Sequence, residues 1–135
     1  MVVARLMVVA RASPGDGLEQ FCRGIRLVSN RDTGRTVVQV LRAVLSNYPG
    51  GEFGSTELSR AARLNRITCI HHLKRLSDAG IVEKDDSRYR LRVRSMDAFM
   101  EEMRREMLAS LAEMEKLAFE LDEDFFGMRP RRGRR

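Results

Sequence analysis

Four arginines recur at every second position in one short segment of the chain: Arg88, Arg90, Arg92 and Arg94. Positions 89, 91 and 93 between them are apolar, so the segment predicts a half-buried strand with its arginines on one face. Like charges on one face repel one another unless a polyanion lies opposite, and nucleic-acid phosphate is the natural candidate. The alternative is an edge strand that charge protects against aggregation. We expect Arg88, Arg90 and Arg92 to contact DNA.

A second set of candidates lies on a helix that we expect over residues 66–79. Steps of 100° per residue put Cys69, Leu73 and Leu76 on one apolar stripe, which would face the core. The opposite side and its flanks carry Arg66, Ile67, Thr68, Ile70, His71, Lys74 and Arg75. Arginine or lysine can donate to guanine O6 and N7, and isoleucine can touch a thymine methyl. We expect this side to enter the major groove; the alternative is a solvated helix face.

Other chemistry finds little support in the residue pattern. His71 and His72 point about 100° apart on a helix, and neither has a carboxylate at i+4, so we expect no metal site. Cys22 and Cys69 form no Cys-x-x-Cys pair and no disulfide framework. No nucleophile has a base at a recognisable spacing, and Gly50, Gly51 and Gly54 lack the lysine of a phosphate loop. We therefore expect no catalytic residues, no cofactor and no enzymatic activity.

The charge is unevenly distributed along the 135 residues, whose net charge is +6. Residues 1–59 carry +2, residues 60–94 carry +6, residues 95–128 carry −7, and residues 129–135 carry +5. A basic block beside an acidic one suggests that one region meets a polyanion and another avoids it. No stretch approaches the roughly 20 apolar residues that span a bilayer, and Arg5 and Arg11 interrupt any secretory signal. We expect a cytoplasmic protein with no membrane contact.

These candidates need a frame of helices and one hairpin to position them. Apolar periodicity and capping residues predict helices over 33–47, from Ser55, over 66–79 and over 96–124, with strands at 81–84 and 88–93. The expected fold is mainly α with a small β-hairpin: a winged helix-turn-helix domain followed by a long C-terminal dimerisation helix. We assign 1–26 to a partly disordered N-terminal extension, 27–94 to the DNA-binding domain, 95–126 to the long helix and 127–135 to a disordered arginine-rich tail.

The segment from the third helix into the hairpin is similar to a known family of regulators. It contains His72-Leu73-Lys74-Arg75-Leu76, then Ala79-Gly80-Ile81-Val82, then Tyr89-Arg90-Leu91, and Leu27-Val28-Ser29-Asn30 lies upstream. These motifs resemble the recognition helix and wing of ArsR-like winged helix-turn-helix transcriptional regulators, over residues 27–94. The resemblance implies a homodimer that binds operator DNA. The Cys-x-Cys pair and the terminal-helix histidines of metal-sensing members are absent, so metal sensing does not carry over.

The long helix carries an apolar seam. Met100, Met107, Met114 and Leu121 repeat every seven residues, as in a coiled coil. Together with its flanks, the seam that we expect to join two subunits is Met96, Met100, Met103, Met107, Leu111, Met114, Leu117 and Leu121. We expect the two helices to run antiparallel or to cross. The alternative is a helix folded back on its own domain, and a small apolar effector between the helices stays open.

The sequence as a whole predicts a dimeric, sequence-specific regulator of transcription that binds double-stranded DNA, with repression expected on the resemblance alone. One alternative is a winged-helix subunit that binds other proteins in a larger assembly. Another is a nonspecific nucleic-acid binder that acts through its arginine-rich tail.

Overall fold

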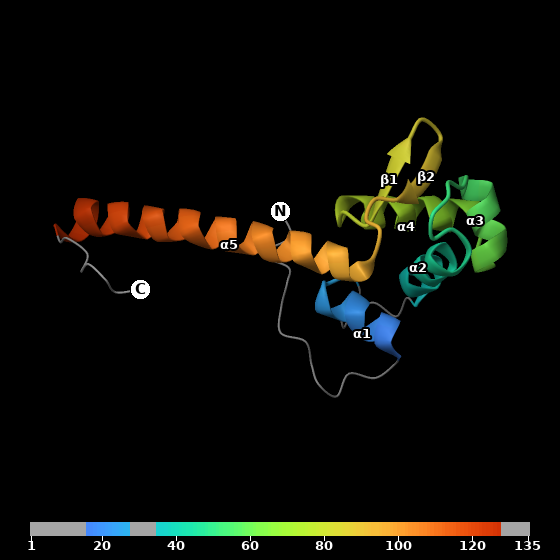
Figure 1. Cartoon of the computed structure of the whole chain (residues 1–135), viewed down its shortest axis with the longest axis horizontal. Coiled ribbons are helices and arrows are strands. Elements are labelled where there is room, and N and C mark those ends of the chain that lie inside the picture. The colour runs from blue at the N-terminus through green and yellow to red at the C-terminus, as the bar shows by residue number, and fades with distance from the viewer. Residues whose placement is uncertain (1–15, 28–34, 128–135) are drawn as a thin grey trace. The chain divides into compact units, whose positions relative to one another are not determined.

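The computed structural model describes residues 16–27 and 35–127. Its elements, in chain order, are α1 (Gly17–Gly24), α2 (Thr36–Asn47), α3 (Ser55–Ala62), α4 (Arg66–Asp78), β1 (Val82–Asp85), β2 (Arg88–Leu91), α5 (Met96–Leu121) and a π-helical turn, η2 (Asp122–Phe126). Figure 1 shows them along the chain. The expectation of a mainly helical chain with one small antiparallel hairpin and a long C-terminal helix is confirmed.

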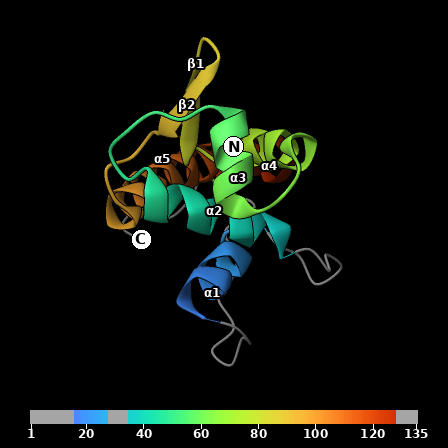
Figure 2. The same ribbon diagram turned by 90° about the vertical axis from the view of Figure 1, so that its right-hand side faces the viewer.

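The chain divides after Phe99 into two compact units, 1–99 and 100–135. In the first unit, α2, α3 and α4 pack on one another, and the hairpin projects from this bundle (Figures 1 and 2). The fully buried side chains that hold the bundle together include Val37, Val40, Leu41, Val44, Leu58, Leu73, Leu76 and Ile81. Burial of each such side chain contributes about 1.5–3 kcal/mol to the stability of the fold. The bundle is therefore the stable frame that holds the surface residues of the first unit in place.

An aromatic stack connects the hairpin to this bundle. Phe53 lies between two tyrosine rings, with centroids 4.7 Å from that of Tyr48 and 5.9 Å from that of Tyr89. The backbones of Phe53 and Tyr89 also exchange hydrogen bonds of 2.9 and 2.8 Å. The segment before α3 is therefore paired with β2, although the two residues are 36 positions apart.

The helix boundaries follow the capping chemistry. The side chain of Asn65 accepts from the backbone N–H of Thr68 at 2.7 Å and so begins α4, as expected. The α4 helix ends at Asp78, and Gly80 then adopts φ +89°, a left-handed conformation that L side chains rarely adopt. The Ser95 hydroxyl accepts from the N–H of Ala98 at 2.9 Å at the start of α5.

Most expected boundaries differ by one to three residues from the observed ones, and two differences affect the make-up of the first unit. We placed residues 1–26 in a partly disordered extension, but Asp16 caps a helix over Gly17–Gly24, and both Cys22 and Leu27 are buried. The ring of Phe21 also meets that of Phe99 edge-on at 6.1 Å. The first unit therefore includes α1, whose apolar residues complete its core. The remainder of the expected N-terminal extension, residues 1–15, lies outside the described residues.

The second difference concerns β2, which ends at Leu91 instead of continuing to residue 93. Residues 92–95 turn the chain into α5, whose 26 residues span about 39 Å at 1.5 Å per residue. The end of α5 widens into η2 and stops at Gly127, which adopts φ +62°. Across residues 16–27 and 35–127, no helix combines the length and apolar character that a membrane crossing requires.

Two isoleucines of the first unit give a matched test of this core. Ile81 is fully buried, whereas Ile67 on α4 is 78% exposed. We expect Ile81→Ala to lower the free energy of unfolding by about 2–5 kcal/mol, because it removes buried methyl groups and leaves a cavity. Ile67→Ala should change it by no more than about 0.5 kcal/mol. Urea denaturation followed by circular dichroism measures both; equal losses would contradict this packing.

Candidate nucleic-acid interface

The connection between α3 and α4 is a three-residue turn over positions 63–65. Arg63 adopts the left-handed conformation, with φ 60° and ψ 42°, and the N–H of Leu64 bonds to the carbonyl of Ser59 at 3.1 Å. Asn65 then caps α4. The Gln39 side chain of α2 donates to the carbonyl of Ala62 at 2.6 Å, so the end of α3 is tied to the bundle. Hydrogen bonds at the end of α3 and at the start of α4 therefore fix the direction in which α4 leaves the turn.

The α4 helix has one buried and one exposed face. Cys69, Leu73 and Leu76 are fully buried, as the sequence predicts. Arg66, Ile67, His71 and Lys74 are exposed, and Thr68 and Ile70 are half-buried beside them. The Nε of Arg66 donates to the hydroxyl of Ser55 at 2.9 Å, across the turn. Most of the predicted reading residues thus share one accessible side of α4.

Arg75 is placed differently. Its guanidinium is half-buried and donates to the backbone carbonyl of Leu27, after α1. The side chain that we expected to face DNA therefore holds the end of the α1 segment against α4. The reason is angular: at 100° per residue, Arg75 lies about 60° from the buried His72, whereas Lys74 lies about 160° from it.

The exposed side of α4 is basic up to its last residue, Asp78, which is exposed and lies four positions after Lys74. Residues 58–77 contain the basic residues Arg60, Arg63, Arg66, Lys74 and Arg75 and no aspartate or glutamate. Arg60 and Arg63 are exposed on α3 and in the turn, next to the start of α4. Sequence reasoning did not single out these two arginines, although their freedom from acidic neighbours could have been read from the chain. They extend the basic surface beyond the predicted reading residues.

The hairpin arginines do not form the bare positive face that we expected. Arg90 bonds through Nε to Glu83 Oε2 at 2.7 Å, and its Nη1 lies 3.4 Å from Glu52 Oε2. The hydrogen bond that Arg90 donates to Glu83 raises the pKa of Arg90 above its already high ordinary value, so this guanidinium stays charged. Arg88 lies 3.3 Å from Glu57 Oε1 and 3.9 Å from Glu52 Oε1. The charges that face these arginines belong to the protein itself.

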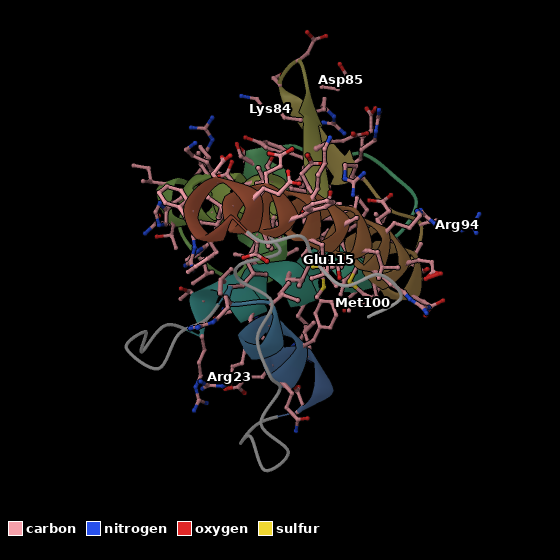
Figure 3. All side chains as sticks on the ribbon, turned by 90° about the vertical axis from the view of Figure 1, so that its left-hand side faces the viewer. Arg23, Lys84, Asp85, Arg94, Met100 and Glu115 are labelled. Carbon is pink, nitrogen blue, oxygen red and sulfur yellow. The ribbon has the colours of Figure 1, made fainter. Side chains whose placement is uncertain are left out.

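The other two arginines of the alternating run leave the strand. Because β2 ends at Leu91, Arg92 lies in the following turn, and its Nε donates to the carbonyl of Gly80 at 2.7 Å. This bond satisfies a carbonyl just beyond the end of α4, so Arg92 ties β2 to that helix. Arg94 is exposed, and Figure 3 shows it away from the labelled hairpin residues Lys84 and Asp85.

The histidines and cysteines have structural positions. His72 is 7% exposed, and its Nε2 lies 2.7 Å from the hydroxyl of Thr36 on α2. His71 is exposed. Burial raises the pKa of the Cys22 thiol to about 11 and also raises that of Cys69, as in inert core thiols. Among the described side chains, no three potential ligands gather as a metal site.

The seam predicted on α5 is exposed along most of its length. Large apolar side chains in the second unit remain open to solvent: Leu108, Leu111, Met114, Leu117, Phe119, Leu121, Phe125 and Phe126. Met100 is at the limit of exposure, and Met96 and Met107 are half-buried. Met103 differs, because it is only 4% exposed in the single chain and so is not part of the exposed stripe. The rest of the predicted seam forms an apolar surface.

Comparison of this chain with protein-family models, with curated proteins and with solved structures finds no match.

Lys74 and Arg75, adjacent on α4, should respond differently to truncation. We expect Arg75→Ala to lower the free energy of unfolding by about 1–3 kcal/mol, because it removes a hydrogen bond to a charged donor and leaves the Leu27 carbonyl without it. Lys74→Ala should change stability by no more than about 0.5 kcal/mol, since its side chain is exposed. Urea denaturation of the two variants checks this; a larger loss for Lys74→Ala would contradict the assignment of faces.

Proposed function

We propose that this chain is a sequence-specific DNA-binding regulator of transcription, in which α3 and α4 form a helix-turn-helix and β1–β2 form its wing. The observation that carries the proposal is the exposed side of α4, which combines Arg66, Ile67 and Lys74 within a 20-residue segment that has no acidic residue. The resemblance of residues 27–94 to ArsR-like regulators, which includes residues of α4 and the hairpin, also supports it.

The chemistry of DNA recognition fits this side of α4. A helix with side chains is about 10–12 Å across, and the major groove is about 12 Å wide. Arg66 or Lys74 would donate to guanine O6 and N7, and Ile67 or Ile70 would contact a thymine methyl. Arg60 and Arg63, beside the start of α4, would hold the phosphate backbone and so set the register of the helix. Repression by obstruction of polymerase is the mode that the resemblance favours.

Two subunits would address two half-sites of a pseudo-palindromic operator. The support for a dimer is the exposed stripe of α5, where Leu111 is 56% and Met114 60% exposed. Contiguous apolar surfaces of this kind mark interaction sites in proteins that stay in solution. The net charge of −7 over residues 95–128 would keep this part of the subunit from competing for DNA.

Glutamates beside the apolar stripe of α5 affect whether two α5 helices pair in parallel or antiparallel. Glu106, Glu113 and Glu120 recur every seven residues beside the Met100–Met107–Met114 positions, at the heptad site called g. In an antiparallel pair of helices each g position faces another g, so the glutamates would oppose one another. In a parallel pair they would face Leu111, Ala118 and Phe125. We therefore favour a parallel pair over the antiparallel or crossed one expected from the apolar positions alone.

The same apolar stripe also fits the alternative of a protein-interaction subunit, in which a different chain would cover it. The second alternative, nonspecific binding through the arginine-rich tail, concerns residues 128–135, which lie outside the described residues. Both alternatives predict outcomes that differ from those of a sequence-reading regulator, and the experiments below include them.

DNA binding is tested by selection from a random duplex pool, followed by fluorescence anisotropy on the selected duplex. We expect the wild type to select a two-fold symmetric sequence. Lys74→Ala should lower the affinity for it by about 5- to 150-fold, the range that the loss of 1–3 kcal/mol from one base contact gives. Lys116→Ala is the matched control, because it removes an exposed lysine of α5 and the same charge. Equal effects of the two variants would sink the assignment of α4 as the reading helix.

The full chain and a 1–128 truncation should bind the selected duplex with affinities within about fivefold, since the truncation removes phosphate contacts at most. Loss of all binding on truncation would favour the nonspecific binder. Absence of duplex binding at moderate salt, together with a stoichiometric protein that co-purifies, would favour the interaction subunit.

The dimer is tested by light scattering on the full chain at tens of micromolar. We expect a dimer for the wild type and a monomer for Met114→Glu, because a charge would replace an apolar side chain at the centre of the stripe. Ala112→Glu, about 160° away around the helix, is the control that should remain dimeric. A Leu121→Cys variant should form an intermolecular disulfide under mild oxidation if the helices are parallel and in register. A monomeric wild type would refute the proposed dimer.

A further inference from the structure

Six side chains on one surface of the first unit form what we call the acid–arginine cluster: Glu52, Glu57, Glu83, Asp85, Arg88 and Arg90. Four carboxylates and two guanidiniums give it a net charge of −2 at neutral pH. Within it, each arginine lies within 4 Å of two or more carboxylates. The run of alternating arginines therefore does not present a positive surface here.

The cluster is assembled from separate elements. Glu83 and Asp85 of β1 pair across the hairpin with Arg90 and Arg88 of β2. Glu52 reaches the same arginines from the segment before α3, because its neighbour Phe53 is bonded to Tyr89. Glu57 comes from the first turn of α3. Figure 3 shows Lys84 and Asp85 on the outer part of the hairpin.

The ion pairs of this cluster contribute little to the stability of the fold. All six side chains are between about one third and two thirds exposed, and an exposed ion pair contributes at most about 1 kcal/mol. The effect on a polyanion is larger. A phosphate that approaches Arg88 or Arg90 must displace a carboxylate from the guanidinium and then remain beside it, so the release of counterions that drives nonspecific binding is largely lost at this surface.

We propose that the carboxylates of the acid–arginine cluster are specificity-determining residues: they withhold Arg88 and Arg90 from DNA phosphate and so leave the choice of sequence to α4. This inference rests on the DNA-binding function proposed above and adds a role for residues that contact no base. A regulator competes against a very large number of wrong sites, so the ratio of specific to nonspecific affinity decides its occupancy. If the arginines were free, the hairpin could hold phosphate in orientations in which α4 is not in the groove, and such orientations add only to nonspecific binding. Carboxylates that prevent these orientations therefore raise the ratio.

The test removes the two nearest carboxylates of Arg90, one of which also lies beside Arg88, without changing the shape of the cluster. Glu52→Gln/Glu83→Gln removes two carboxylate charges and keeps the length of both side chains. Glu57 is left in place because it also accepts from the N–H of Gly54 at 2.7 Å and caps α3. The matched control is Glu115→Gln/Glu123→Gln, which removes two exposed carboxylates outside the cluster and changes the net charge equally.

The measurement is anisotropy with a labelled duplex of random sequence across a series of KCl concentrations. Arg90, which loses its two nearest carboxylates, should steepen the slope of log K against log salt by up to about 0.9, the value of one phosphate contact, and Arg88, which keeps Glu57, should add less. The affinity for random duplex should rise at physiological salt. The control should steepen the slope by less than half of one contact. The ratio of selected to random affinity should fall only in the cluster variant.

A second variant tests the wild-type state directly. Arg88→Ala/Arg90→Ala should change the binding of random duplex by less than about threefold in the wild type, and should abolish the gain in the Glu52→Gln/Glu83→Gln background. If it instead costs the wild type more than about tenfold and flattens the salt slope by about two contacts, these arginines already hold phosphate and the inference is overturned. It is also overturned if the wild type selects a sequence but the glutamine variant behaves like the control. A wild type that binds no duplex would refute the proposed function itself.

Discussion

The paired hydrogen bonds between Phe53 and Tyr89 determine where the hairpin lies on the first unit and which charges line its surface. They close a contact over 36 residues, and the rings of the same two residues stack at 5.9 Å. Without this contact the hairpin would be two four-residue strands, which are at most marginally stable alone. With it, the hairpin is attached to the bundle and Glu52 lies beside the arginines of β2. One backbone contact thus sets both the position of the hairpin and the sign of its surface.

The burial of α4 has an equally direct consequence for function. Because His72 is buried together with Cys69, Leu73 and Leu76, the interior face of α4 is shifted toward Arg75 and away from Lys74. Lys74 lies outside and is available to a ligand, whereas Arg75, one step of 100° further on, reaches back to Leu27. Two adjacent residues of the same charge therefore have different roles. Lys74 is a candidate for contact with DNA, whereas Arg75 stabilises the packing of the α1 segment on α4.

The parts of the fold that depend on local chemistry were predictable from the sequence. Asn65 as a helix cap and the stripe of α4 both follow from rules that act over a few residues. The helix α1 was missed although Leu18, Phe21, Cys22 and Ile25 have helical spacing behind the cap Asp16. Part of the arginine pairing was also within reach, because a turn at residues 86–87 sets Glu83 opposite Arg90 and Asp85 opposite Arg88. The contribution of Glu52 was not, since it depends on the long-range contact between Phe53 and Tyr89.

The distribution of charge makes some exposed surfaces attractive to a polyanion and others repulsive. Residues 58–77 carry five basic residues and no acidic one, and Asp78 then ends α4, so a polyanion meets least repulsion over the first turns of that helix. The hairpin over residues 82–91 carries three basic and three acidic residues in sequence, yet its surface is negative once Glu52 and Glu57 are added by the fold. The acidic flank of α5 has the same sign. Because electrostatic attraction to phosphate is blind to sequence, a molecule that confines it to one helix gives that helix the greatest influence over which sequence is bound.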